Sequence, residues 1–161
     1  MIETAHTDSL TISVLARLLA GVRCGVLDAN LETNQVVFDV DFQNQPLRSV
    51  AQLLPGSDEV CTKLMLGSAM RGVTSGSAQA LMLVNEYNRH ALFGRAYFCP
   101  ESEAVYFEAD LWLTSASGAG QVRQFIDWFC GALRAFVVTI GALRHAFLAQ
   151  SGIPDGPRIL A

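Results

Sequence analysis

Apolar and polar residues alternate in three stretches of the chain, a pattern that predicts strands with one buried face. In 34–42 (NQVVFDVDF) the residues Val36, Phe38, Val40 and Phe42 share one side. The stretches 91–99 and 104–114 alternate in the same way on either side of "PESE" at 100–103. These two stretches therefore predict a hairpin that closes on that turn.

The turn fixes the register of the hairpin, because the loop length decides which residues face each other. The expected pairs are Leu92 with Leu111, Phe93 with Asp110, Gly94 with Ala109, Arg95 with Glu108, Ala96 with Phe107, Tyr97 with Tyr106, Phe98 with Val105 and Cys99 with Ala104. An opposite-charge pair and a tyrosine pair then meet on the outer face, and both are favourable cross-strand neighbours. A shift by one residue would break both patterns.

Apolar residues at spacings of three and four predict helices over 8–21, 77–90 and 118–150. Asp8 or Ser9 can cap the first helix, and Gly21 can end it. The last helix carries a seam of large apolar residues, namely Phe129, Leu133, Phe136, Ile140, Leu143 and Phe147. A helix this apolar is either deeply buried or part of an oligomer interface.

The remaining segments predict short strands and a tail. Residues 23–28 and 34–42 form the first two strands, and 60–71 forms the third. The segment 43–60, bounded by Pro46 and Pro55, fits either a helical turn or a loose edge. The Pro/Gly-rich stretch 151–161 predicts a flexible tail after a single domain over 1–150.

Composition narrows the classes of partner. The chain has 161 residues, is 51% hydrophobic and 16% charged, and carries a formal net charge of -4. Nucleic acid binding needs a concentrated basic surface, and here the arginines are scattered and Lys63 is the sole lysine. The excess of apolar residues favours a large core or a surface reserved for a partner.

The sequence predicts a cytoplasmic protein. The longest uncharged apolar run is shorter than the roughly 20 residues needed to span a bilayer, and the N-terminus is acidic where a signal peptide would be basic. Cys24, Cys61, Cys99 and Cys130 are far apart and lack the spacing of metal ligands. We expect buried free thiols in a reducing compartment, with no metal and no cofactor.

Catalytic chemistry has weak support in the sequence. Asp39 with Asp41, and Glu108 with Asp110, point the same way from their strands, but no histidine or nucleophile completes a constellation around them. Such acids are typical of the solvated face of a sheet. The glycine-rich "GSAMRGVTSGSA" lacks the lysine of a phosphate-binding loop. We therefore expect a protein without enzymatic activity.

Two asparagines lie on the second predicted helix. Asn85 shares a face with Leu81 and Val84, so we expect a buried amide hydrogen-bonded to nearby backbone. Asn88, in the last turn, can tie the end of the helix to the entry into "ALFGRAYF". A structural role is favoured over ligand binding for both.

The order "LVNEYNRHALFGRAYFCPESEAVYFEADLWL", followed by a long apolar helix, resembles the YbjN family, labelled a "putative bacterial sensory transduction regulator". The resemblance rests on Asn85, Asn88, Arg95 with Ala96, the "PESE" turn, and Glu108 to Leu111, and it covers about 78–140. It implies a type III secretion chaperone-like fold, which is an α+β sandwich of order α-β-β-β-α-β-β-α with an antiparallel sheet packed against helices, commonly dimeric.

Two functions remain open from the sequence. The first is a protein-binding module, chaperone-like or regulatory, that acts as a homodimer with the last helix in the dimer interface. The residues expected to contact a protein partner are Leu15, Leu18 and Leu19 on the first helix and Tyr97, Tyr106 and Trp112 on the outer sheet face. The alternative is a small-ligand sensor with a pocket between sheet and last helix, lined by Phe107, Phe125 and Trp128. Neither function implies nucleic acid or a membrane.

Overall fold

The structure is a computed structural model that describes residues 10–55, 62–73, 76–114 and 117–151. The described residues form three helices and six strands. In chain order these are α1 (Ile12–Gly21), β1 (Gly25–Asn30), β2 (Gln35–Phe42), β3 (Gln45–Pro55), β4 (Thr62–Arg71), α2 (Ser77–His90), β5 (Arg95–Cys99), β6 (Ala104–Leu113) and α3 (Ala119–Ser151). The tail predicted at 151–161 lies outside the described residues from 152 onward.

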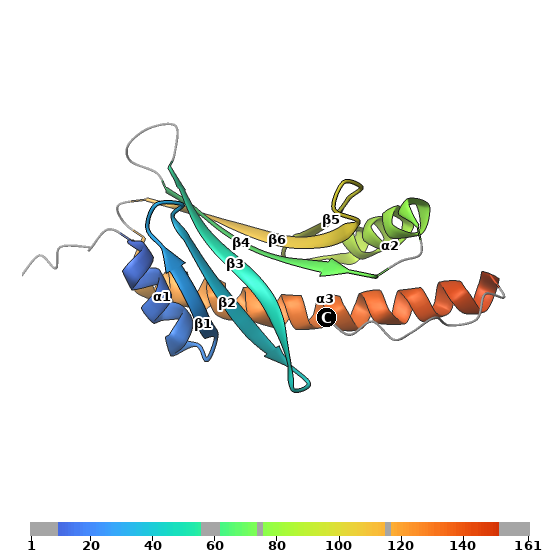
Figure 1. Ribbon diagram of the computed structural model, residues 1–161, viewed down its shortest axis with the longest axis horizontal. Helices are drawn as coiled ribbons and strands as arrows, with labels where there is room; N and C mark the ends of the chain where they lie inside the picture. The colour runs from blue at the N-terminus through green and yellow to red at the C-terminus, as the bar shows by residue number, and fades with distance from the viewer. Residues whose placement is uncertain (1–9, 56–61, 74–75, 115–116, 152–161) are drawn as a thin grey trace, which may run out of the picture.

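The six strands form one antiparallel sheet in the order β1-β2-β3-β4-β6-β5. The long helix α3 runs along the molecule behind β1 to β3, and α1 and α2 lie toward its two ends (Figure 1). All three helices contribute buried residues to a single hydrophobic core with the inner face of the sheet. The predicted α+β sandwich is confirmed.

The segment left ambiguous at 43–60 contains a full strand, so four strands precede α2 where three were expected. Leu47, Ser49, Ala51 and Leu53 point inward from β3 and are buried. The two central residues, Ser49 and Ala51, are polar and small, so an alternation of hydrophobic residues cannot be recognised in this part of the sequence. The stretch predicted as the third strand is confirmed as a strand, and it is the fourth, β4.

The hairpin register is confirmed over five pairs, from Arg95 with Glu108 to Cys99 with Ala104. The pairing expected further along, of Leu92 with Leu111, of Phe93 with Asp110 and of Gly94 with Ala109, is wrong, because β5 begins at Arg95. Gly94 takes a left-handed conformation at φ +72°, which turns the preceding chain away from β6.

Gly94 is required by space as well as by conformation. A Cβ atom built there would lie 2.5 Å from Cζ of Phe107 and 2.9 Å from the carbonyl oxygen of Glu108. Phe107 cannot retreat, because its ring stacks against Phe129 and Phe136 with centroids 5.7 and 5.1 Å apart. The backbone at the start of β5 therefore lies directly against the aromatic centre of the core.

The apolar seam of α3 faces this core as predicted. Phe129, Leu133, Phe136 and Ile140 are at most 2% exposed, whereas Leu143 and Phe147 near the end of the helix are only half-buried. At the other end of the molecule Thr11 caps the N-terminus of α1, and its side chain accepts a hydrogen bond from the Val14 amide at 3.3 Å. The caps expected at Asp8 and Ser9 lie outside the described residues.

Candidate functional site

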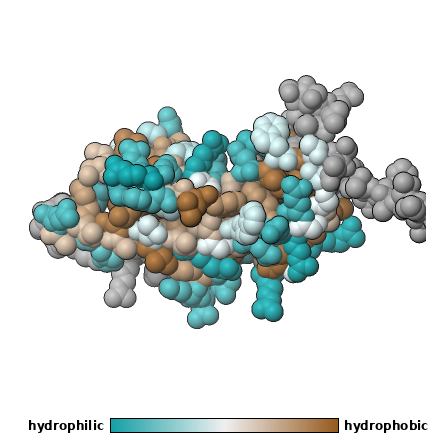
Figure 2. All heavy atoms as spheres, turned by 180° about the vertical axis from the view of Figure 1, so that it is seen from behind, coloured by the Kyte–Doolittle hydropathy of each residue, from teal (hydrophilic) through white to brown (hydrophobic). Residues whose placement is uncertain are grey.

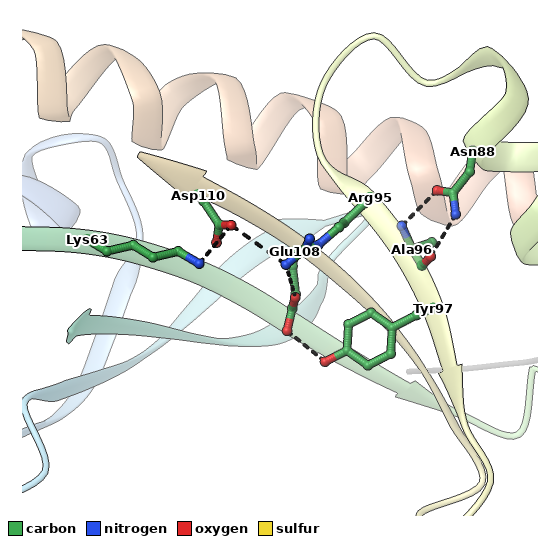
Figure 3. Close-up of polar contacts among 7 residues, drawn as sticks. All are labelled: Lys63, Asn88, Arg95, Ala96, Tyr97, Glu108 and Asp110. Atoms are coloured by element: carbon green, nitrogen blue, oxygen red, sulfur yellow. Dashed lines mark hydrogen bonds and ion pairs between the residues drawn. The ribbon is translucent and has the colours of Figure 1, made fainter. Parts of the chain in front are cut away.

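The outer face of the sheet carries a network of charged side chains around β6 (Figure 3). Lys63 Nζ on β4 lies 2.9 Å from Oδ2 of Asp110, and Arg95 lies 3.6 Å from the same oxygen. Arg95 also lies 3.5 Å from Oε2 of Glu108, the pair predicted from the register. The hydroxyl of Tyr97 donates to Oε1 of Glu108 at 2.6 Å. Three strands thus bring five polar side chains into contact.

Local sequence explains why these groups converge. On β6, alternate residues put Glu108 and Asp110 on the same face, and Gly67 stands opposite Glu108 on β4. A Cβ on Gly67 would lie 3.7 Å from Cγ of Glu108, which is an ordinary van der Waals contact. Burial raises the pKa of the Tyr97 hydroxyl, and its hydrogen bond to the Glu108 carboxylate adds to the shift.

One carboxylate oxygen in this network is unsatisfied. Oδ1 of Asp110 is buried and has no hydrogen-bond partner in the described part of the chain, although Oδ2 of the same residue has two cationic neighbours. Buried polar atoms are normally paired, so an exception of this kind marks a position where a donor from outside would gain a hydrogen bond. Lys63 could not be predicted as a partner of Asp110 from the sequence, because the pairing of β4 with β6 is not local.

The tyrosine pair is present as expected. Tyr97 and Tyr106 stack with ring centroids 5.1 Å apart and planes 6° apart. Tyr97 is 39% exposed and Trp112 is 61% exposed, whereas Tyr106 is half-buried. Lys63 Nζ lies 5.8 Å from the ring centroid of Trp112. The aromatic residues predicted to contact a partner therefore lie on an accessible face.

The residues predicted to contact a partner from the first helix lie elsewhere. Leu15 and Leu19 are 0% exposed and belong to the core, and Leu18 is half-buried. The reason is that α1 packs its apolar stripe against β1, β2 and α3, which completes the core at that end of the sheet. Leu15 and Leu19 are thus inaccessible in this fold, and assigning them to a partner surface was wrong.

The two asparagines behave differently. The prediction that Asn85 is buried is wrong, because its side chain is exposed and α2 buries Gln79, Ala80, Leu83 and Val84 instead. Asn88 does tie the helix to the next strand. Its Nδ2 donates to the Ala96 carbonyl at 2.7 Å, and its Oδ1 accepts from the Ala96 amide at 2.9 Å (Figure 3). One side chain thereby satisfies both the amide and the carbonyl of Ala96 at the free edge of β5.

The space expected to hold a small ligand, between the sheet and α3, is occupied by aromatic rings. Phe107 is fully buried in contact with Phe129 and Phe136, and Phe125 packs against Phe93 at 5.7 Å. Trp128, expected to line a pocket, is 57% exposed on the outside of α3. A hollow of about 310 Å³ lies instead at the sheet edge, lined by Leu92 to Arg95 and Glu108 to Asp110.

The remaining candidates for chemistry have structural partners. Asp39 pairs with Arg48 at 2.6 Å across β2 and β3. No group of three or more histidine, cysteine or acidic residues that could hold a metal occurs within the described ranges. Cys24 and Cys130 are buried, with sulfur atoms 3.6 Å apart, while Cys99 is half-buried and Cys61 lies outside the described residues. Contact with Cys24 and burial raise the pKa of the Cys130 thiol.

Helix α3 is long and apolar enough to cross a membrane, judged by length and composition over 119–150. A third of its most apolar stretch is buried within the protein. The same residues that raise its hydropathy, Phe129, Leu133 and Phe136, fill the core against the sheet. Core helices of soluble proteins satisfy the same criterion.

Comparison with known proteins gives a family and a fold. A family model described as "YbjN: Putative bacterial sensory transduction regulator" matches residues 27–141. Four chains of solved structures match, among them "Crystal structure of YbjN, a putative transcription regulator from E. coli". That match has a TM-score of 0.54 and 12% sequence identity, and it covers 86% of this chain and 97% of the other. No curated protein matches. The chain has the hydrogen bonds from Asn88 to Ala96, the β5–β6 hairpin and the long final helix described above. It belongs to the YbjN family.

Proposed function

We propose that this protein is a non-enzymatic, protein-binding regulator that acts as a homodimer. Its family is described as regulatory, in keeping with this role. The acidic residues that would be the first candidates for catalysis are engaged in contacts that stabilise the sheet: Asp39 with Arg48, Glu108 with Tyr97, and Asp110 with Lys63. The observation that carries the proposal is the outward face of α3.

A stripe of that face is exposed, and after the polar Gln124 its residues are apolar or small. Six exposed residues follow one another there at spacings of four and three, namely Gln124, Trp128, Gly131, Ala135, Val138 and Ala142. Trp128 is 57% exposed and Val138 is 55% exposed. Figure 2, which shows the molecule from behind, has apolar side chains gathered along its long axis. An exposed seam with this spacing is typical of helices that pack against another helix.

The order of large and small residues on this seam fits a second copy of the same helix running antiparallel. Ala135 lies midway between Trp128 and Ala142, so a two-fold axis at Ala135 places the indole of one protomer opposite the small Ala142 of its partner. The same axis brings Val138 to within one residue of Gly131 of the partner. Bulky side chains thus meet small ones between Trp128 and Ala142, a contact of about 21 Å at 1.5 Å of helix per residue.

The test is the mass of the protein in solution, measured by sedimentation equilibrium at micromolar concentration. We expect a dimer for the unmodified chain and a monomer for Ala135→Glu, because the two introduced carboxylates would meet at the axis. Val138→Glu should also dissociate the dimer. Met82→Glu on α2 is the matched control, since Met82 is 56% exposed and should leave the mass unchanged.

A monomeric unmodified chain, or equal effects of Val138→Glu and Met82→Glu, would refute the dimer.

The partner surface is a separate part of the proposal: we place it on the outer sheet face, where Tyr97 and Trp112 are accessible beside the half-buried Tyr106. We place the protein in the cytoplasm, which the close pair of buried thiols Cys24 and Cys130 supports.

A further inference from the structure

Strand β6 extends beyond its neighbour β5. The whole of β6, Ala104–Leu113, pairs with β4, but β5 covers only the half from Ala104 to Glu108. The chain before Arg95 turns toward α3, where Phe93 packs between Phe125 and Trp128 at centroid distances of 5.7 and 6.2 Å. The edge of β6 from Ala109 to Leu113 therefore has no strand beside it in the described part of the molecule.

The hydrogen bonds of Asn88 show which backbone groups face this open edge. Because Asn88 binds both the amide and the carbonyl of Ala96, these groups point away from β6, and the Ala96–Phe107 pair is a non-hydrogen-bonded one. Direction alternates along an antiparallel strand, so Phe107 points toward β4 and Glu108 toward β5. By the same alternation, the N–H and C=O groups of Asp110 and Trp112 point into the uncovered space.

Side chains around the open edge add features of a binding site. The hollow of about 310 Å³ occupies the corner between β6 and the segment that leaves it, with Leu92, Arg95 and Asp110 on its walls. Leu92 is fully exposed and Trp112 is 61% exposed, so apolar surface is available. The unsatisfied Oδ1 of Asp110 belongs to the same corner and lacks only a donor.

We propose that an extended segment of a partner protein binds here as an added strand, antiparallel to β6 and in line with β5. Its backbone would pair with Asp110 and Trp112, and a lysine or arginine opposite Asp110 would donate to Oδ1. A residue two positions earlier would pack on Trp112. This inference rests on the proposed protein-binding function and names its partner: a strand-forming segment that alternates apolar and basic residues.

The first measurement is amide hydrogen exchange of the protein alone, with the exchange of each amide monitored by NMR. The amides of Asp110 and Trp112 should exchange far faster than those of Ala109 and Leu111, which are bonded to β4. Slow exchange at both Asp110 and Trp112 at low protein concentration would show that the edge is already covered and would overturn the proposal. Protection that appears only as protein concentration rises would identify a second copy as the occupant, and would also overturn it.

Binding is then measured by fluorescence anisotropy with three labelled peptides: alternating valine and lysine, alternating valine and glutamate, and the valine–lysine peptide with methylated backbone nitrogens. We expect only the first to bind and to protect the Asp110 and Trp112 amides. Asp110→Asn should weaken its binding at least about tenfold, as expected for loss of a hydrogen bond to a charged group. Asp28→Asn, the same change on the exposed β1 edge, should leave binding unchanged.

Trp112→Pro gives a second, independent variant. Its N–H faces the open edge, so proline removes a donor for the incoming strand without removing a hydrogen bond to β4. Loss of binding with an unchanged circular dichroism spectrum supports the added strand. Equal binding of the lysine and glutamate peptides, or binding of the methylated peptide, refutes it.

A monomer that still binds the lysine peptide would refute only the homodimer, and a dimer that binds none of the three would refute only the added strand.

Discussion

The two outer strands of the sheet protect their free edges by different means. On β5, the side chain of Asn88 covers the exposed backbone groups of Ala96 with two hydrogen bonds. On β1 all six residues are exposed, and protection comes from an irregularity in the pairing with β2 between Val26 and Asp28. Bulges and charges of this kind discourage another strand from pairing. One edge therefore depends on a specific side chain from a helix, and the other on backbone geometry.

This difference makes the uncovered half of β6 unusual within the sheet. Its pairing with β4 is regular throughout, and it has neither an amide cap like Asn88 nor a bulge like that of β1. An edge that is regular, uncovered and adjacent to a hollow is the one best suited to accept a strand. The contrast between β5 and β1 also predicts that mutations near β5 are costly and that mutations on β1 are mild.

The largest effect is expected for Gly94→Ala, at the start of β5. The new methyl group would overlap the buried ring of Phe107, and the left-handed backbone disfavours any side chain. Overpacking and conformational strain together should lower the free energy of unfolding by about 3 kcal/mol or more. Chemical denaturation with urea measures this change.

Gly72→Ala is the matched control for the clash. Gly72 has a similar φ of +67°, but a Cβ there would meet nothing within 4 Å. Only strain should remain, at about 1 kcal/mol. Equal losses for the two variants would contradict the view that Gly94 is required by its contact with Phe107.

The next largest effect is expected for Asn88→Ala, which would uncover the edge of β5. Two backbone groups of Ala96 lose their partners, so the free energy of unfolding should fall by about 2 kcal/mol. Asn85→Ala, one turn away on an exposed position of the same helix, should change it by less than about 0.5 kcal/mol. Similar losses for both asparagines would contradict the edge role of Asn88.

These two asparagines also show what the sequence could and could not predict. The link from Asn88 to the next strand follows from local signals, because the helix end and the strand are only a few residues apart. Whether Asn85 is buried or exposed depends on which face of α2 is turned toward the core, and this is not a local property of the sequence. Leu81 and Met82 are 49% and 56% exposed, so apolar residues occur on the solvent side and blur the pattern.

The same distinction separates the hairpin from the rest of the sheet. Register from Arg95 to Cys99 could be predicted because a tight turn and alternation agree. Strand β3 could not, since its inward residues include Ser49 and Ala51, whose burial is set by neighbours β2 and β4. The network of Lys63 with Asp110 likewise required knowledge of which strands are adjacent.

A smaller effect is expected for Tyr97→Phe on the outer face of β5. The variant keeps the ring stacked on Tyr106 but loses the hydrogen bond to Glu108, which should cost about 1 kcal/mol. Tyr106→Phe is the control, since the Tyr106 hydroxyl donates to Ser102 over a longer distance of 3.3 Å and the loss of this bond should cost less.

The Tyr97 hydroxyl should also make stability depend on alkaline pH. Its pKa is raised in the folded protein, so its contribution is fully present below the unfolded pKa of about 10 and is lost as pH rises through the higher folded value. Urea denaturation on either side of pH 10 should show a steeper loss for the unmodified chain than for Tyr97→Phe. Parallel curves would contradict a raised pKa at Tyr97.

The smallest effect is expected for Leu27→Ser on β1. Leu27 lies where the register with β2 shifts, and its side chain is 51% exposed, so it adds little to the core. The free energy of unfolding should change by less than about 0.5 kcal/mol, and the mass in solution should not change. A loss above about 1 kcal/mol would mean that β1 relies on this side chain after all, as β5 relies on Asn88. A change in mass would move the dimer contact from α3 to the β1 edge, because Leu27 and Ala135 cannot both lie at the centre of one two-fold interface.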